Sequence, residues 1–165
     1  MITLASWGML FGTFVLSAGL ARVRASQWPP DGIIGLDAYL PSIATLALIL
    51  SSVLIHKGYM RFDKENLKEF KFYWGLGLLM GVFFLALQSY TLIDWYSKGV
   101  RVSQHLYASV IYVWIIIHGL HILGALGGLF YKFKKPKSAA SLQIWGWFWH
   151  FIDLVWLAMF PLLVF

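Results

Sequence analysis

Five long apolar stretches, separated by short segments rich in charge or proline, constrain the fold of this chain more than any other feature. A membrane-spanning helix takes about 20 predominantly apolar residues, and each stretch is long enough. The composition agrees, because 60% of the 165 residues are hydrophobic and only 12% are charged, whereas soluble domains average about 25% charged residues. Lipid is therefore expected to surround most of the molecule.

The stretches predict an all-α integral membrane protein, a five-transmembrane-helix bundle that forms a single membrane domain over residues 1–165. The expected helices cover approximately residues 2–22, 38–56, 72–94, 102–131 and 139–164. A β-barrel would need segments of about 10 residues with strict alternation of apolar and polar side chains, and these stretches are apolar on every side. The first stretch lacks the basic start and cleavage motif of a signal peptide, so we interpret it as a retained helix.

The lysines and arginines are unevenly distributed between the connecting segments. Nine would lie on one side of the membrane, namely Lys57, Arg61, Lys64, Lys68, Lys71, Lys132, Lys134, Lys135 and Lys137, against Arg22, Arg24, Lys98 and Arg101 on the other. The positive-inside rule then predicts a cytoplasmic N-terminus and a periplasmic C-terminus in a bacterial cytoplasmic (inner) membrane. The net charge of +6 follows this topology, which disfavours a nucleic-acid-binding face.

Several kinds of chemistry are excluded by what the sequence lacks. It has no cysteine, which excludes disulfides, zinc–thiolate sites and iron–sulfur clusters. It has no Gly-x-Ser-x-Gly nucleophile motif and no phosphate-binding loop, so we expect no catalytic residue in this chain. The lack of charged residues within four of the five predicted spans disfavours a small-molecule transporter.

Polar residues within the last two predicted spans are the main candidate functional residues. Asp153 is the only acid in the interior of a predicted span, and an aspartate at the centre of a membrane helix costs on the order of 2.5–3.5 kcal/mol on insertion scales. His150 lies one turn before it on the same face, and His118 and His121 form a second pair one turn apart in the preceding span. If the two faces oppose each other, the imidazoles neutralise the acid in a structural polar network.

A metal or haem site and a proton relay are the competing interpretations. A haem-binding cytochrome b anchor also uses histidines from membrane helices, but His118 and His121, on one helix, cannot both bind one iron axially. A di-iron site needs several acids, and only Asp153 is available. A proton relay needs a second titratable group at another depth, and the predicted spans offer none. We therefore expect a structural network without a bound metal.

Small and aromatic residues predict how the helices pack. Glycines at four-residue spacing allow helices to approach closely, and the pairs are Gly8 and Gly12, Gly77 and Gly81, and Gly124 and Gly128. Trp145, Trp149 and Trp156 fall on one side of the last predicted helix, over more turns than one interfacial aromatic band covers. They predict an interface with another subunit.

The last two stretches carry motifs that resemble a known family. Residues 149–156 read Trp-His-Phe-Ile-Asp-Leu-Val-Trp and resemble the Trp-His-Phe-(Val/Ile)-Asp-x-Val-Trp hallmark of subunit III of haem-copper cytochrome c oxidases. Residues 118–124, with Gly119 and Gly124, resemble its second hallmark, His-Gly-Leu-His-Val-x-x-Gly. Further matches are Trp28, Pro29 and Pro30 in the first connection and Gln88 in the third span.

The resemblance implies the five-helix bacterial form of subunit III, a non-catalytic part of an aerobic terminal oxidase that reduces O2 to water and pumps protons. Such a chain would pack mainly on subunit I, stabilise it and support its proton uptake, with subunit II, small subunits and a larger respiratory supercomplex as further partners. It would bind phospholipid, while haems and copper would lie in partner subunits. A subunit III-like accessory protein of nitric oxide reductase is the alternative within the family.

The chain departs from the family pattern at Ala44, where the family has Asn before Thr, and at three positions of family carboxylates. Family members often carry carboxylates where this chain has Trp7, Thr91 and Gln143. The resemblance therefore implies none of the functions of those carboxylates here.

Overall fold

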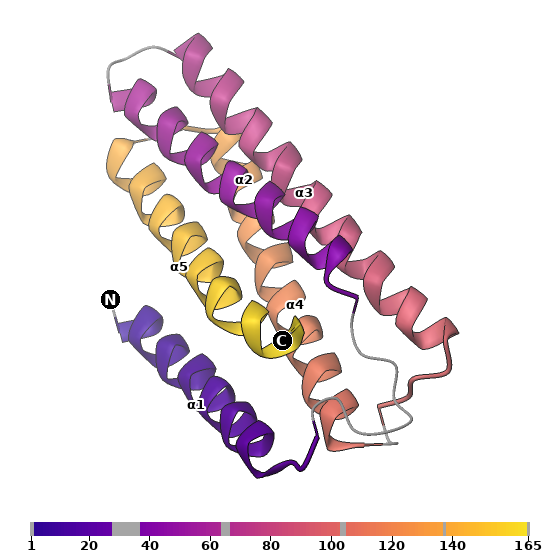
Figure 1. Ribbon diagram of the computed structural model, residues 1–165. Coiled ribbons are helices and arrows are strands. Elements are labelled where there is room, and N and C mark those ends of the chain that lie inside the picture. The colour runs from indigo at the N-terminus through magenta and orange to yellow at the C-terminus, as the bar shows by residue number, and fades with distance from the viewer. Residues whose placement is uncertain (1, 28–36, 64–66, 103–104, 137, 165) are drawn as a thin grey trace.

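The computed structural model describes the backbone of residues 2–27, 37–63, 67–102, 105–136 and 138–164, and all regular structure in these ranges is helical (Figure 1). The side chains of residues 2–7 and 63 lie outside the description. The five helices are α1 (Ile2–Arg24), α2 (Tyr39–Asp63), α3 (Leu67–Ser97), α4 (Leu106–Lys134) and α5 (Ala139–Val164). The predicted all-helical fold and its five helices are confirmed.

Among the described residues, four helices are both long enough and apolar enough to cross a membrane. These are α2, over Tyr39–Phe62, and α3, α4 and α5 over their whole lengths. The protein is therefore a multi-pass membrane protein. That α1 also crosses the bilayer, and that the N-terminus is cytoplasmic, stay predictions.

The charged segment expected to connect the second and third helices, residues 56–71, is largely helical. α2 continues to Asp63 and α3 already begins at Leu67. Lysine, arginine and glutamate are good helix formers, and a helix that leaves the apolar layer can keep its turns while water solvates the charges. An ion pair of 3.0 Å between Arg61 and Glu69 joins the two helix ends. One consequence is that His56 lies inside α2 and not at its end.

The helices pack as a hairpin of α2 and α3 with α5 and α4 beside it, and α1 on the outer side of α5 (Figure 1). The α2–α3 and α4–α5 connections lie at the same end of the bundle. We call this end the basic end, because it carries the described residues Lys57, Arg61, Lys68, Lys71, Lys132, Lys134 and Lys135. The structure thus places the more basic connections together, as the predicted topology requires.

Glycines let the helices approach closely at some of the predicted positions. A Cβ on Gly77 would lie 2.9 Å from the side chain of Ile55, and one on Gly81 would lie 2.8 Å from the ring of Trp149. A Cβ on Gly128 would lie 1.9 Å from Trp145. The remaining members of the pairs, Gly8, Gly12 and Gly124, are not tightly packed. Close approach therefore concentrates where α3 and α4 meet their neighbours.

Hydrogen bonds from buried side chains connect neighbouring helices within the described residues. The Ser51 hydroxyl donates to the Gly77 carbonyl at 2.7 Å, which joins α2 to α3. Trp74 Nε1 donates to the Leu129 carbonyl at 3.1 Å, which joins α3 to α4. Trp156 Nε1 donates to Thr45 Oγ1 at 2.9 Å, which joins α5 to α2.

The tryptophans of α5 correct one expectation from the sequence. Trp149 and Trp156 are only 1% and 0% exposed, so they are core residues of this chain and do not form an interface with another subunit. Their rings occupy the space beside Gly81 and Thr45. Trp145 is half-buried over Gly128.

Candidate functional site

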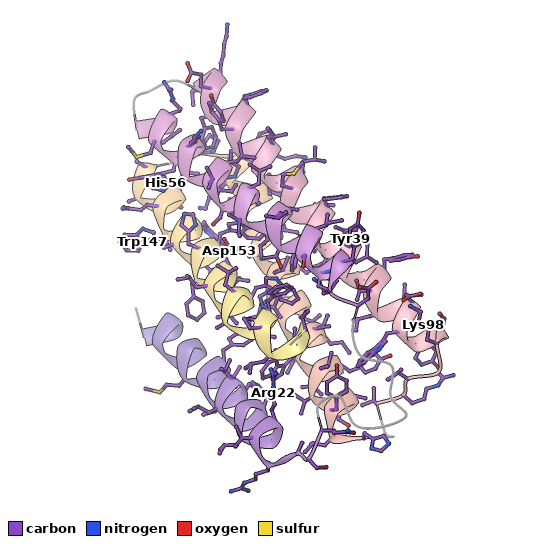
Figure 2. The ribbon with its side chains drawn as sticks, viewed as in Figure 1. Arg22, Tyr39, His56, Lys98, Trp147 and Asp153 are labelled. Carbon is purple, nitrogen blue, oxygen red and sulfur yellow. The ribbon has the colours of Figure 1, made fainter. Side chains whose placement is uncertain are left out.

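A small polar cluster lies between α2 and α5, near the middle of the bundle (Figure 2). His150 Nδ1 and Ser52 Oγ are 2.5 Å apart and hydrogen-bonded. The same Ser52 hydroxyl hydrogen-bonds the carboxyl group of Asp153, whose Oδ1 has no partner among the described residues. Ser52 and Asp153 are each 7% exposed, and His150 is half-buried. A serine on α2 therefore joins the acid of α5 to the imidazole one turn earlier.

The sequence places His150 and Asp153 on one face because residues three apart on a helix are neighbours. On α2, Ser52 lies between the buried Leu48 and Ile55, one turn away on either side, so its hydroxyl points into the α2–α5 contact. Ser51 beside it points toward α3 and bonds Gly77 there. Two adjacent serines thus serve two different helix contacts.

The histidines of α4 do not join this cluster. His118 is 1% exposed and stacks on the Trp156 indole, with ring centroids 5.3 Å apart. Neither of its ring nitrogens has a hydrogen-bond partner among the described residues. His121 Nδ1 bonds the Ile117 carbonyl of its own helix at 2.7 Å. The expected pairing of Asp153 with the α4 imidazoles is absent from the described part of the chain, because Asp153 turns toward α2 and Trp156 lies against His118.

Other residues singled out from the sequence have varied surroundings. Gln88 is buried with both amide atoms lacking a partner among the described residues. A Cβ on Gly119 would make ordinary contact with Leu85, whereas Gly124 faces open space. Thr91 donates to the Leu87 carbonyl of its own helix. Trp28, Pro29, Pro30 and the side chain of Trp7 lie outside the described residues.

His56 is a titratable residue near the cluster that stands at the end of the second predicted helix and was not singled out from the sequence. It lies one turn after Ser52 on α2, and its ring centroid is 5.8 Å from that of His150. A cavity of about 70 Å³ opens beside these two rings and is also lined by Tyr59, Gln143 and Gly146. Its spacing of one helical turn from Ser52 is the sequence signal that could have revealed His56.

Within the described residues, no three histidine, aspartate or glutamate side chains are grouped as metal ligands would be. The cluster instead combines an acid, a hydroxyl and two imidazoles in one row. Such a row can hold and pass protons, and it can hold two helices together, since hydrogen bonds between polar side chains also stabilise helix association in membranes.

The fold and the cluster define a multi-pass α-helical membrane protein whose polar residues are shared between helices. Residues 7–165 match the family of cytochrome c oxidase subunit III. The chain belongs to this family, and the resemblance seen in its motifs is confirmed. Membership makes it a subunit of a respiratory oxidase complex, in electron transport.

Relatives match along almost the whole chain. It is 30% identical over 174 residues to cytochrome c oxidase subunit 3 of Thermostichus vulcanus, covering 99% of this chain and 83% of the relative. A probable cytochrome c oxidase subunit 3 of Nocardia farcinica is also 30% identical, over 99% of this chain and 84% of the relative. One of Rickettsia bellii is 28% identical over 96% of this chain and 57% of the relative.

Proposed function

We propose that this chain is the non-catalytic subunit III of an aerobic haem-copper terminal oxidase in the bacterial inner membrane. It packs on subunit I, stabilises it and supports its proton uptake, while the haems and copper are held by partner subunits. Subunit II, small subunits and a larger respiratory assembly are further partners. The proposal rests on the family membership and on how the hallmark residues are used.

The observation that carries the proposal is that the hallmark side chains build the interior of this chain. Trp156 bonds Thr45 and stacks on His118, and Trp149 fills the space over Gly81. Residues buried in contacts within the chain stabilise its fold and do not form an open active site. The polar cluster also stabilises the fold, because His150, Ser52 and Asp153 hold α5 against α2.

The surroundings of His118 also disfavour the alternative of a haem-binding anchor. Besides the stacked Trp156, the rings of Phe84 and Phe11 contact its edges, with centroids 6.2 and 6.4 Å away. An axial histidine needs a free path from its nitrogen to the iron and flat space for the porphyrin. Aromatic rings fill that space here.

We also propose that phospholipid chains occupy two grooves on the outside of the bundle. One of about 400 Å³ lies along α4 and α5, where Gly124 leaves room between Leu120 and Trp145. Another of about 440 Å³ lies between α1 and α5, beside Gly12 and Leu154. Both are lined almost entirely by apolar side chains, as acyl chains require.

Purification in mild detergent through an affinity tag on this chain tests the assignment. We expect companion subunits whose optical spectrum shows haem–copper bands and copper A. A companion with the spectrum and activity of nitric oxide reductase would contradict the oxidase assignment. Soret absorbance in the isolated chain would contradict the non-catalytic role.

Removal of the chain from the purified complex tests the supporting role. If the chain supports proton uptake by subunit I, its loss lowers the O2 reduction rate more at alkaline pH, where protons are scarcer. Rates should be expressed per haem, so that a loss of assembled enzyme is separated from a loss of turnover. An identical pH profile with and without the chain would refute this role and leave only stabilisation.

A further inference from the structure

We propose that Asp153 is a proton-exchanging group, which takes up and releases a proton through a track formed by Ser52, His150 and His56. The track leads from the α2–α5 contact toward the basic end of the bundle. This inference goes beyond the bracing role and does not depend on it, because it concerns the side chains of this chain alone.

The inner half of the track is the row of hydrogen bonds from Asp153 to Ser52 to His150. Ser52 Oγ is 2.5 Å from His150 Nδ1 and also bonds the Asp153 carboxyl group. A serine hydroxyl has one proton to donate and lone pairs to accept. It therefore serves both partners at once only if it donates to one and accepts from the other.

This row has two proton arrangements with the same heavy-atom positions. When Asp153 is ionised, Ser52 donates to the carboxylate and accepts the Nδ1 proton of His150. When Asp153 is protonated, the carboxyl donates to Ser52, and Ser52 donates to His150 Nδ1. Conversion of the first into the second passes the Nδ1 proton of His150 to the serine oxygen and the serine proton to Asp153, while Nε2 of His150 takes up a proton from the cavity side, so that the imidazole stays neutral. The reverse transfers release a proton at Nε2 and restore the first arrangement.

The outer half of the track consists of His56 and the cavity beside it. The two imidazole rings are 5.8 Å apart between centroids, and His56 is exposed whereas His150 is half-buried. The cavity of about 70 Å³ touches both rings and has space for about two water molecules, each of which fills roughly 30 Å³ in the liquid. Tyr59 and Gln143 supply further polar atoms in its wall. Water in this cavity links the outer nitrogen of His150 to His56.

The inner and outer halves of the track lie at different depths along the axis of the helix bundle. Figure 2 shows Asp153 at the middle of α5, and His56 and Trp147 nearer the basic end. The residues ascend by single helical turns, from Ser52 to His56 on α2 and from Asp153 to His150 on α5. If the basic end is cytoplasmic, the track opens on the side from which an oxidase takes up protons.

The titratable groups that face the track come from two helices. They are His56 and Tyr59 of α2 and His150 of α5. On α4, His118 packs on the ring of Trp156. From α1, the described residues bring Gly8 beside Phe151. No described lysine or arginine contacts Asp153, so its charge depends on protons that move along the row.

Infrared difference spectroscopy of the complex that contains this chain tests the proposal. The carbonyl stretch of the protonated Asp153 carboxyl is identified as the band that Asp153→Asn removes. In wild type, we expect this band to shift promptly after transfer to D2O, and to appear and disappear with pH. Ser52→Ala interrupts the row, and His56→Leu removes its outer end, so each should slow the shift by about tenfold or more, the effect of roughly 1.4 kcal/mol on a barrier.

Matched variants separate exchange from folding. Ser51→Ala also removes a buried bond of α2, to Gly77, but lies outside the track, so the band should exchange as in wild type. His105→Leu removes a histidine at the opposite end and should likewise leave exchange unchanged. If Ser52→Ala and His56→Leu exchange as fast as these controls, or if no exchangeable band belongs to Asp153 at any pH, the track is refuted. Neither result depends on whether the chain supports subunit I.

Discussion

The packing of Trp145 against Gly128 gives a prediction whose magnitude follows from the structure. A Cβ added to Gly128 would lie 1.9 Å from Cζ3 of the Trp145 ring, whereas ordinary contact begins at about 3.4 Å. In Gly128→Ala the indole must therefore withdraw by at least about 1.5 Å, or α4 and α5 must separate. Overpacking of a well-packed contact typically costs about 1–3 kcal/mol.

Helix propensity works in the opposite direction, since alanine favours a helix by up to about 1 kcal/mol over glycine. Gly127→Ala provides the matched control, because a Cβ there meets nothing within 4 Å. The two variants share the gain in propensity, and only one has the clash. We expect Gly128→Ala to be less stable than Gly127→Ala by about 1–3 kcal/mol.

The measurement is reversible unfolding of the full chain in lipid–detergent bicelles, followed by circular dichroism, for both variants. Trp145→Ala serves as a second background, because without the indole Gly128→Ala should lose its penalty, and the difference is a coupling energy. Equal stability of the two alanine variants, or a penalty that persists without Trp145, would refute the packing of α4 on α5 through this glycine.

Three further outcomes follow from single contacts. Thr45→Val should destabilise the chain by about 1–3 kcal/mol in the same unfolding assay, because it leaves the buried Trp156 N–H without its acceptor, whereas Thr45→Ser should restore most of the loss. Gln88→Leu should raise stability by about 1–3 kcal/mol, since it removes a buried amide without described partners; a loss of stability would show that the amide is bonded. The carboxylate of Asp94 raises the pKa of Lys98 above its usual value. Any stabilisation from this pair is therefore present at neutral pH and lost as the pH rises through the raised pKa of Lys98. Because exposed ion pairs contribute little to stability, Asp94→Asn should leave the thermal midpoint unchanged.

The number and approximate position of the helices could be predicted from the sequence because a bilayer leaves few alternatives. Backbone groups in lipid must be bonded within a helix or a closed barrel, so a long apolar stretch specifies a helix almost by itself. The residues at which the helices end were less predictable. Charge in residues 56–71 indicated a connection, but helix formers outside the apolar layer continue the helix, and the bilayer no longer fixes its length. His56, the last residue of the second predicted span, was not singled out for this reason.

The helix that each face contacts was harder to predict than the residues that share a face. Helical spacing correctly placed His150 and Asp153 on one face of α5, and it showed that Trp149 and Trp156 share a side. It carried no information on which helix each face meets. Asp153 meets Ser52 of α2 and not the histidines of α4, and the tryptophans meet α3 and α2 within the chain. Such pairings depend on the order of helices in space, which a single sequence does not encode in its periodicity.

The position of α5 explains why the hallmark motif is concentrated on it. α5 packs against α1, α2 and α4, and Trp149 also reaches Gly81 of α3, so its side chains must match four different surfaces within two turns. Large rings suit the places where glycine or threonine leaves room, as Trp149 and Trp156 show. Polar atoms suit the side where α2 presents the hydroxyl of Ser52. A substitution in this motif therefore changes two helix contacts together, and the bracing and proton-exchange roles proposed here meet in the same eight residues.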